Sequence, residues 1–220
     1  MRKGFLTRTA IAMLAGLLLQ GCTPGQQSMV DTFSAVVTGD RDITVPDAQI
    51  AALPYSTMYL RLNGGQRIFV VLGYIGQGQS KWLSQDGAMM VTRNGRLMKT
   101  VNLHYNLLNI TATTPDPLLQ AKSLTAGTTW QRVIQWTEEG HYRAATLKSR
   151  FEPAGSEVLN IAGQAVSCQV WHENVESTAP VRSWRNTFWI DTRTSQVRQS
   201  QQMLGAGVFP VEFTTLKPAP

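Results

Sequence analysis

Short segments in which apolar and polar residues alternate follow one another from Pro54 almost to the end of the chain. A period of two places alternate side chains on opposite faces of a β-strand, so this pattern predicts strands rather than helices. Gly, Pro, Asn, Asp or Ser separates most of the segments and marks turns. The predicted strands are Tyr55–Leu62, Gln66–Tyr74, Met89–Thr92, Leu97–Leu103, Trp130–Trp136, His141–Phe151, Glu157–Ile161, Ala165–Val175, Ser183–Ile190 and Gln196–Met203.

Two of the turns define hairpins. Asn63-Gly64-Gly65 joins the first two predicted strands, and Asn94-Gly95 joins the next two as a type I′ turn. Strands that follow one another without long helices favour an antiparallel meander. Because a twisted sheet of this many strands has to curl, we predict a mainly β fold: an antiparallel meander sheet curled into a half-barrel or a sandwich, with a short N-terminal helix.

The first 22 residues have the layout of a secretory signal. Three basic residues precede the apolar run Ala10–Leu19, which is too short to cross a bilayer of about 30 Å as a helix. Leu19-Gln20-Gly21-Cys22 has the lipobox form and resembles bacterial lipoprotein signals. The resemblance implies cleavage before Cys22, a diacylglycerol on its thiol and an acyl chain on its new amine, and several acyl chains make an effectively permanent anchor.

The remaining chain divides into two parts. Cleavage removes residues 1–21 and leaves a lipidated tether, residues 22–28, and a single β-rich domain, residues 29–220. The apolar spacing in Met29–Val37 predicts the short helix, and Thr44–Leu53 predicts either a further helical turn or an extended crossing. Thr23 stands where an Asp would retain a lipoprotein at the inner membrane, so we expect a lipid-anchored protein of the outer membrane that faces the periplasm.

The distribution of charge and the number of cysteines argue against nucleic-acid binding and against a disulfide. Of 20 basic residues, three lie in the signal, so 17 remain against 14 acids. They are scattered, whereas nucleic-acid binding needs clustered Lys and Arg, so no nucleic-acid partner is expected. Once Cys22 carries lipid, Cys168 has no disulfide partner, and its alternation with Val166 and Val170 predicts a small buried residue rather than a reactive thiol.

Patterns that would support catalysis are weak. The segment Gly73–Gly78 lacks the glycine order of a nucleotide loop and is predicted to be a flexible loop. Glu138-Glu139 beside Gly140 predicts a hairpin tip rather than a glycosidase pair. We expect no catalytic residue, no metal and no cofactor besides the lipid on Cys22, although a Ser-His-Asp triad is recognised only by its geometry. The histidine ligands of a metal would have to come from His104, His141 and His172. These residues lack the close spacing of metal ligands and are expected on separate strands.

Trp184, between Arg182 and Arg185, is the strongest candidate for glycan contact among six tryptophans. Aromatic faces stack on sugar rings, and guanidinium groups pair with the carboxylates of an acidic polysaccharide. Tryptophan is also ordinary core material in β proteins. Both interpretations of Trp184 stay open from the sequence.

Several segments of the mature chain are recognisable together. Besides the lipobox they are LPYSTMYLRLNGG, IFVVLGY, DPLLQAKSL, FWIDTRTSQVRQSQQMLGAG and PVEFTTLKP. They resemble the YjbF/GfcB family of lipoproteins, which are encoded with exopolysaccharide and group-four capsule export genes in enterobacteria. The resemblance covers residues 45–218 and includes no known catalytic motif.

The resemblance implies an outer-membrane lipoprotein with a curled, mostly antiparallel sheet and an accessory role in polysaccharide secretion or assembly. It implies other polysaccharide-export proteins of the envelope as partners. Three functions stay open: a non-enzymatic accessory factor for export, a periplasmic glycan-binding module and a polysaccharide-modifying enzyme.

Overall fold

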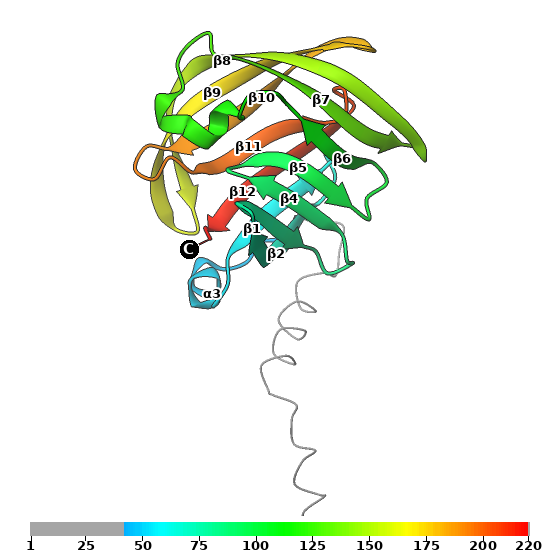
Figure 1. The fold of residues 1–220 in the computed structure, drawn as a ribbon. Coiled ribbons are helices and arrows are strands. Elements are labelled where there is room, and N and C mark those ends of the chain that lie inside the picture. Colours follow the sequence, from blue (N-terminus) through cyan, green and yellow to red (C-terminus); the bar gives the residue numbers. More distant parts are fainter. Residues whose placement is uncertain (1–41, 220) are drawn as a thin grey trace, which may run out of the picture. The chain divides into compact units, whose positions relative to one another are not determined.

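The computed structural model of the protein describes residues 42–219 (Figure 1). Cys22, the tether and the helix predicted at Met29–Val37 lie outside these residues. The described helices are α3, Asp47–Ala52, and the 3-10 helix η2, Pro117–Ser123. The strands are β1 Thr57–Leu62, β2 Arg67–Gly76, β3 Gln79–Leu83, β4 Met89–Arg93, β5 Arg96–Val101, β6 Asn106–Thr111, β7 Thr129–Glu138, β8 His141–Ile161, β9 Gln164–Thr178, β10 Val181–Asp191, β11 Val197–Leu204 and β12 Phe209–Lys217.

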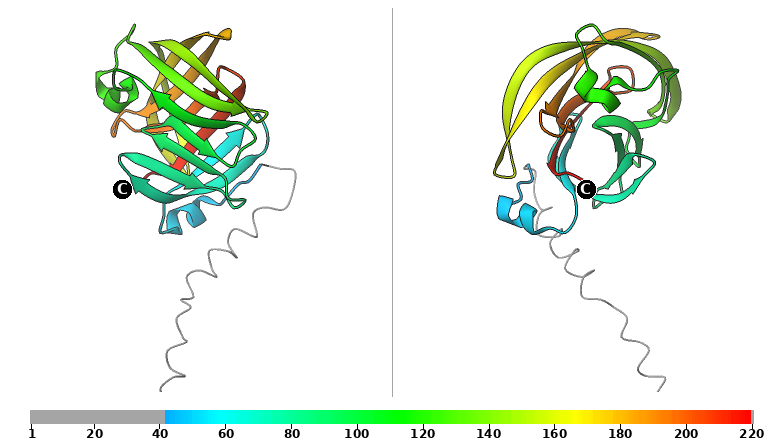
Figure 2. Two further views of the ribbon diagram at one scale, coloured as in Figure 1. Left: turned by 45° about the vertical axis from the view of Figure 1, so that its right-hand side comes forward. Right: turned by 60° about the vertical axis from the view of Figure 1, so that its left-hand side comes forward.

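The twelve strands form one sheet in the order β5-β4-β3-β2-β1-β12-β11-β10-β9-β8-β7-β6. Neighbouring strands pair antiparallel, and the pairing of β1 with β12 brings the two ends of the described fold together. A flat sheet of this size would hold its edges about 50 Å apart. Only residues 102–105 link the edge strands β5 and β6, and four residues reach about 15 Å at most. The sheet therefore curls into a nearly closed barrel, which confirms the predicted curled meander (Figure 2).

Side chains join the two edges of the sheet at the seam between β5 and β6. The backbone N–H of Leu107 donates a hydrogen bond to Thr100 Oγ1 at 2.9 Å. Thr100 is almost fully buried, with 1% of its surface exposed. One buried hydroxyl thus supplies the acceptor that a neighbouring strand would otherwise provide.

The tip of the β4–β5 hairpin docks on β11 inside the curled sheet. Leu97 N–H donates to Gln202 Oε1 at 3.1 Å, and Gln202 Nε2 donates to the carbonyl of Gly95 at 2.8 Å. A Cβ on Gly95 would lie 2.3 Å from Val197 Cβ. Two constraints therefore require glycine at this turn: the positive φ of Gly95 and the close approach of the β4–β5 hairpin to β11.

Apolar side chains fill the inner face in two clusters. One includes Met58, Val70, Trp136 and Val211, contributed by β1, β2, β7 and β12. The other lies where η2 packs, around Leu118, Phe151 and Phe188, each with 0% exposed surface. Asp116 begins η2 by accepting a hydrogen bond from Leu118 N–H, with Pro117 in the first turn, an arrangement that favours helix initiation.

The observed strands confirm both predicted hairpins and differ elsewhere. The segments His141–Phe151 and Glu157–Ile161 belong to one strand, β8, which carries an irregularity between Pro153 and Ser156. The flexible loop predicted at Gly73–Gly78 is wrong, because this segment ends β2 and turns into β3. Strands β3, β6 and β12 lie outside the predicted set. Thr44–Leu53 combines an extended start with the helix α3.

Candidate functional site

The residues predicted to contact glycan do not share one surface. Trp184 is half-buried, packs against the inner apolar cluster and lies over Gly207, where a Cβ would come within 2.8 Å of the indole. Its neighbour Arg185 points to the opposite face of β10, and its Nε donates to Asn174 Oδ1 at 3.1 Å. Arg182 is exposed two residues before Trp184. Any sugar at Trp184 could therefore be reached by Arg182 but not by Arg185.

The other residues weighed for chemistry are separated or unreactive. Cys168 is buried, as predicted, and burial, with the nearby Asp191 carboxylate, raises the pKa of its thiol to about 11. A thiol with so high a pKa stays protonated and is a poor nucleophile. Glu138 and His141 pair across the turn at Glu139-Gly140, so this is a hairpin tip.

The histidines lie apart, and only two of them are on strands. His104 is in the link between β5 and β6, whereas His141 and His172 are on β8 and β9. Within residues 42–219 no group of three His, Cys, Asp or Glu side chains is placed to hold a metal ion. In the same residues no helix is long and apolar enough to cross a membrane.

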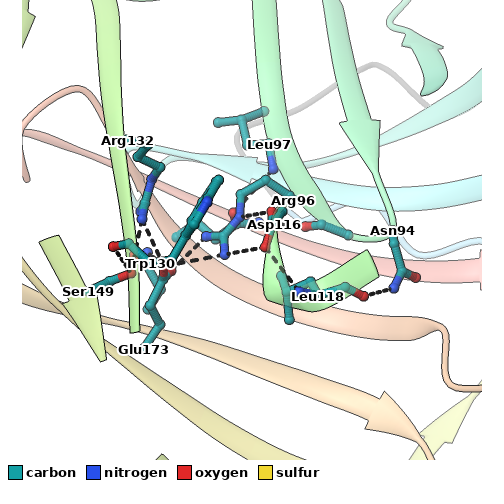
Figure 3. Close-up of polar contacts among 12 residues, drawn as sticks. Asn94, Arg96, Leu97, Asp116, Leu118, Trp130, Arg132, Ser149 and Glu173 are labelled. Atoms are coloured by element: carbon teal, nitrogen blue, oxygen red, sulfur yellow. Dashed lines mark hydrogen bonds and ion pairs between the residues drawn. The ribbon is translucent and has the colours of Figure 1, made fainter. Parts of the chain in front are cut away.

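A buried ion cluster lies inside the curled sheet (Figure 3). Glu173 is fully buried, and its carboxylate oxygens lie 2.6 Å from Arg96 Nη1 and 3.0 Å from Arg132 Nη1. Asn186 Nδ2 donates to the same carboxylate at 2.8 Å. Asp116 lies 2.8 Å from Arg96 Nε. The cluster thus contains two positive and two negative side chains, and it joins β5, β7, β9 and β10 to the start of η2.

Aromatic rings complete the surroundings of the two guanidinium groups. The Arg132 guanidinium lies 4.4 Å from the centroid of a Trp130 ring, and that of Arg96 lies 4.9 Å from the Phe188 centroid. Cations are attracted to aromatic faces, most strongly where water is excluded. These contacts stabilise the buried charges of the ion cluster.

The electrostatics of the ion cluster suit a structural role. Burial by itself would raise the pKa of Glu173, but the charges of Arg132 and Arg96, with hydrogen bonds from Arg96 and Asn186, hold this pKa at about 2. A carboxylate with so low a pKa does not donate or take up protons near neutral pH. Burial lowers the pKa of Arg96, but the charges of Asp116 and Glu173 outweigh burial and raise it. The ion cluster therefore holds strands together, and its central carboxylate, Glu173, stays ionised near neutral pH.

A polar groove, which we call the outer groove, crosses the opposite face of the sheet. Two rows of outward-pointing side chains run across β11, β12, β1 and β2 in register. One row pairs Gln199 with Thr214, Thr214 with Tyr59, and Tyr59 with Phe69; the other pairs Gln201 with Glu212, Glu212 with Arg61, and Arg61 with Arg67. The residues that line the groove are Tyr59, Leu60, Arg61, Arg67, Gln199, Ser200, Gln201, Glu212, Phe213 and Thr214.

The lead segment, residues 42–45, fixes the β1–β2 side of the outer groove. Arg61 Nη2 donates to Asp42 Oδ2 at 2.6 Å, and the backbone N–H of Arg67 donates to Asp42 Oδ1 at 3.0 Å. Val45 N–H donates to the Tyr59 hydroxyl at 2.7 Å. Hydrogen bonds from the Arg61 side chain and the Arg67 backbone N–H lower the pKa of Asp42 below its ordinary value. The aromatic and basic side chains here are held in place by the chain that leads into the domain.

The β11–β12 side of the outer groove is more open. Glu212 has 46% of its side chain exposed and lies 3.9 Å from Arg61 Nε. Gln201 is exposed, and among residues 42–219 no hydrogen-bond partner is found for its side-chain amide. The hollow has a volume of about 170 Å³. Since a water molecule takes up about 30 Å³ in the liquid, the groove has room for several waters.

Sequence reasoning did not find the outer groove. Its side chains are single polar residues on four strands, and they meet only because β1 pairs with β12, more than 150 positions later in the chain. The alternation of TMYLRL and FPVEFTTLK does show which side chains face outward. The missing information was the long-range pairing that aligns them.

Known proteins of one family match nearly the whole chain. The family described as group 4 capsule polysaccharide lipoprotein GfcB, YjbF matches residues 30–216. The uncharacterized lipoprotein GfcB of Escherichia coli (strain K12) is 62% identical over 97% of this chain and 100% of its own length. The uncharacterized lipoprotein YjbF of the same organism is 36% identical over 97% of this chain and 99% of its own.

A solved structure is similar as well. The crystal structure of the hypothetical lipoprotein YmcC from Escherichia coli (K12) has a TM-score of 0.81 and 58% sequence identity, and it covers 90% of this chain and 98% of its own. The similarity therefore extends from the sequence to the fold. The chain therefore belongs to the YjbF family of group 4 capsule polysaccharide lipoproteins.

Proposed function

We propose that the protein is an outer-membrane lipoprotein, anchored through Cys22 and facing the periplasm, that assists the export or assembly of capsular polysaccharide without catalysing a reaction. Membership of a family of group 4 capsule lipoproteins supports the capsule-related role. The lipobox and Thr23 support the anchor and its membrane. Other envelope proteins of polysaccharide export are the proposed partners.

The state of Glu173 is the observation that carries the non-enzymatic part of the proposal. A deeply buried carboxylate is the usual position for a general acid with a raised pKa. Here both oxygens are paired with arginines and the pKa is lowered to about 2. The buried thiol of Cys168 has a raised pKa. The pKa shifts of these two buried groups thus disfavour proton transfer by Glu173 and nucleophilic attack by Cys168.

Deletion of the gene in its own strain tests the role in the capsule. We expect less surface polysaccharide, or shorter chains, and recovery with the wild-type gene but not with Cys22→Ser, which removes the thiol that takes the lipid. Polymer amount and chain length are measured by gel electrophoresis and immunoblotting. An unchanged capsule in the deletion strain would reject the accessory role.

Two further measurements separate the parts of the proposal. Purified protein incubated with the capsular polymer should generate no new reducing ends, and their appearance would establish an enzyme. Membrane fractionation should place the wild-type protein in the outer membrane, and Thr23→Asp should shift it to the inner membrane. Wild-type protein in the inner-membrane fraction would contradict the proposed location.

A further inference from the structure

We propose that the outer groove binds a neutral, hydroxyl-rich sugar unit within a polysaccharide chain. The identification of the ligand as part of a polysaccharide rests on the proposed function. The chemistry of the groove itself gives the class of unit and the residues that contact it: Gln201, Glu212 and Thr214, with Tyr59 and Arg61 at the wall.

The hydrogen-bonding groups of the outer groove match a ligand with many hydroxyls. A hydroxyl both donates and accepts, so its binding site needs both kinds of partner. Gln201 offers an amide with donors and an acceptor, Glu212 offers acceptors, and Thr214 offers a hydroxyl that already donates to Gln199 Oε1 at 3.2 Å. Gln201 is exposed without a side-chain partner among the described residues, so it can bind a ligand without first breaking a contact.

The charges of the outer groove favour a neutral sugar over an acidic one. Arg61 and Arg67 supply two positive charges, and Glu212 together with Asp42 of the lead segment supplies two negative charges. Arg61 is committed to Asp42 at 2.6 Å, and Arg67 Nη2 donates to Thr44 Oγ1 at 2.8 Å. An anion would therefore meet Glu212 without gaining a free guanidinium. A uronic acid or phosphate is not the preferred ligand.

The shape of the outer groove fits one unit of a polymer. Its volume of about 170 Å³ accommodates one sugar ring, whose hydroxyls replace several waters. It lies on the outer face of a sheet and is open to solvent, so a chain can continue beyond the bound unit. A closed pocket would instead select a free monosaccharide.

Tyr59 serves as a wall of the outer groove. Its ring is contacted on one face by the Arg67 guanidinium, 4.3 Å from the centroid, and Phe69 meets it edge-on with 6.0 Å between centroids. Because the Arg67 guanidinium already covers one face of this ring, recognition here depends mainly on hydrogen bonds. Binding by a few exposed hydrogen bonds is weak, which suits a polymer that has to move on.

Nuclear magnetic resonance of the full mature chain in detergent micelles tests the proposal. The probe is a mixture of neutral oligosaccharides from partial hydrolysis of the strain's capsular polysaccharide, with glucuronic acid and inorganic phosphate as anionic comparisons. We expect saturable shifts of the Gln201 and Gln199 side-chain amides with the neutral probe. Gln201→Ala should weaken binding about five- to tenfold, whereas Gln135→Ala, exposed on β7, should leave it unchanged.

A second variant tests the charge argument. Glu212→Gln keeps a hydrogen-bonding side chain but gives the groove a net positive charge, so glucuronic acid should then bind more tightly than it does to the wild-type protein. Absence of saturable shifts, equal binding by Gln201→Ala and wild type, or preference of the wild type for either anion would overturn the proposal. If Trp184→Ala abolishes binding while Gln201→Ala does not, the sugar binds at Trp184 on β10 instead of in the outer groove, and the proposal is overturned as well.

The two proposals fail separately. If the probe binds at Gln201 but deletion of the gene leaves the capsule unchanged, the accessory role is rejected and the groove stands. If deletion reduces the capsule but no probe binds, the groove proposal is rejected and the accessory role stands.

Discussion

Glu173 illustrates how one buried residue can determine the stability of a fold. Its carboxylate is surrounded by Arg96, Arg132 and Asn186 and has no exposed surface. Removing one partner from a buried ion pair leaves the other charge without compensation. Here a single substitution would leave two buried guanidinium groups with only Asp116 as counter-charge.

Glu173→Gln should therefore lower the free energy of unfolding by about 3–5 kcal/mol, measured by urea denaturation. The matched control is Glu212→Gln, whose exposed carboxylate lies 3.9 Å from Arg61 and should cost about 1 kcal/mol or less. Equal losses in the two variants would show that the ion cluster adds no stability beyond that of a surface pair.

The same carboxylate predicts a pH dependence. The pKa of Glu173 is about 2 in the folded protein, against an ordinary value of 4.5. Because the folded value is lower, the ionised carboxylate stabilises the fold above pH 4.5, and that stabilisation is lost as the pH falls toward 2. The shift corresponds to about 3 kcal/mol. Unfolding free energies measured from pH 7 to 2 should fall more steeply for the wild type than for Glu173→Gln, and parallel curves would contradict the assignment.

At the scale of elements, the hairpin turns show most directly how sequence determines local structure. Asn94 and Gly95 have φ values of 40° and 77°, as a type I′ turn requires. Gly95 carries a second constraint, its approach to Val197, which only the docked hairpin reveals. The local signal specifies the turn, and the tertiary contact makes it intolerant of a side chain.

Gly95→Ala and Gly87→Ala separate these two constraints. Gly87 has a φ of 80° and open space around its Cβ position, so alanine there should cost about 1–2 kcal/mol for backbone conformation alone. Gly95→Ala adds overlap with Val197 and should cost about 1–3 kcal/mol more. Thermal and urea unfolding measure both, and equal costs would mean that the β4–β5 tip moves away from β11 freely.

Two of the three strands that the sequence leaves unpredicted, β3 and β6, share a physical reason, whereas β12 does alternate between buried and more exposed side chains. β3 and β6 have five and six residues, and each has only one fully buried side chain, Trp82 and Leu107, so neither shows a clear alternation. In β8 the Pro-Ala-Gly run resembles a break, but proline is tolerated at an irregularity of the sheet. Prediction from pattern succeeds where one face is buried and a turn residue marks the end.

At the scale of the whole molecule, closure of the sheet depends on contacts that no local pattern encodes. The curled meander follows from the number of strands, whereas the pairing of β1 with β12 and the seam between β5 and β6 do not. For the same reason the outer groove and the ion cluster are absent from the sequence-based candidates. Cys168 was placed correctly because its burial follows from alternation within one strand.

Thr100→Val tests whether the seam holds the sheet closed. Valine keeps the shape but removes the acceptor for Leu107 N–H, which should cost about 1–3 kcal/mol. Hydrogen exchange should accelerate more at Leu107 than at Val175 of β9, which pairs with both neighbouring strands. Equal acceleration at the two amides would mean that the seam opens only with global unfolding.

The attachment of the lead segment has a mechanical consequence. Asp42 is tied to Arg61 and to the backbone of Arg67, and β1 and β2 are among the inner strands of the sheet rather than at its edges. We expect a force applied from the N-terminal end to act first on the contacts of Asp42 with Arg61 and Arg67. The force is then distributed from β1 to both of its neighbours, β2 and β12. The edge strands, which peel most easily under tension, would carry the least of the load.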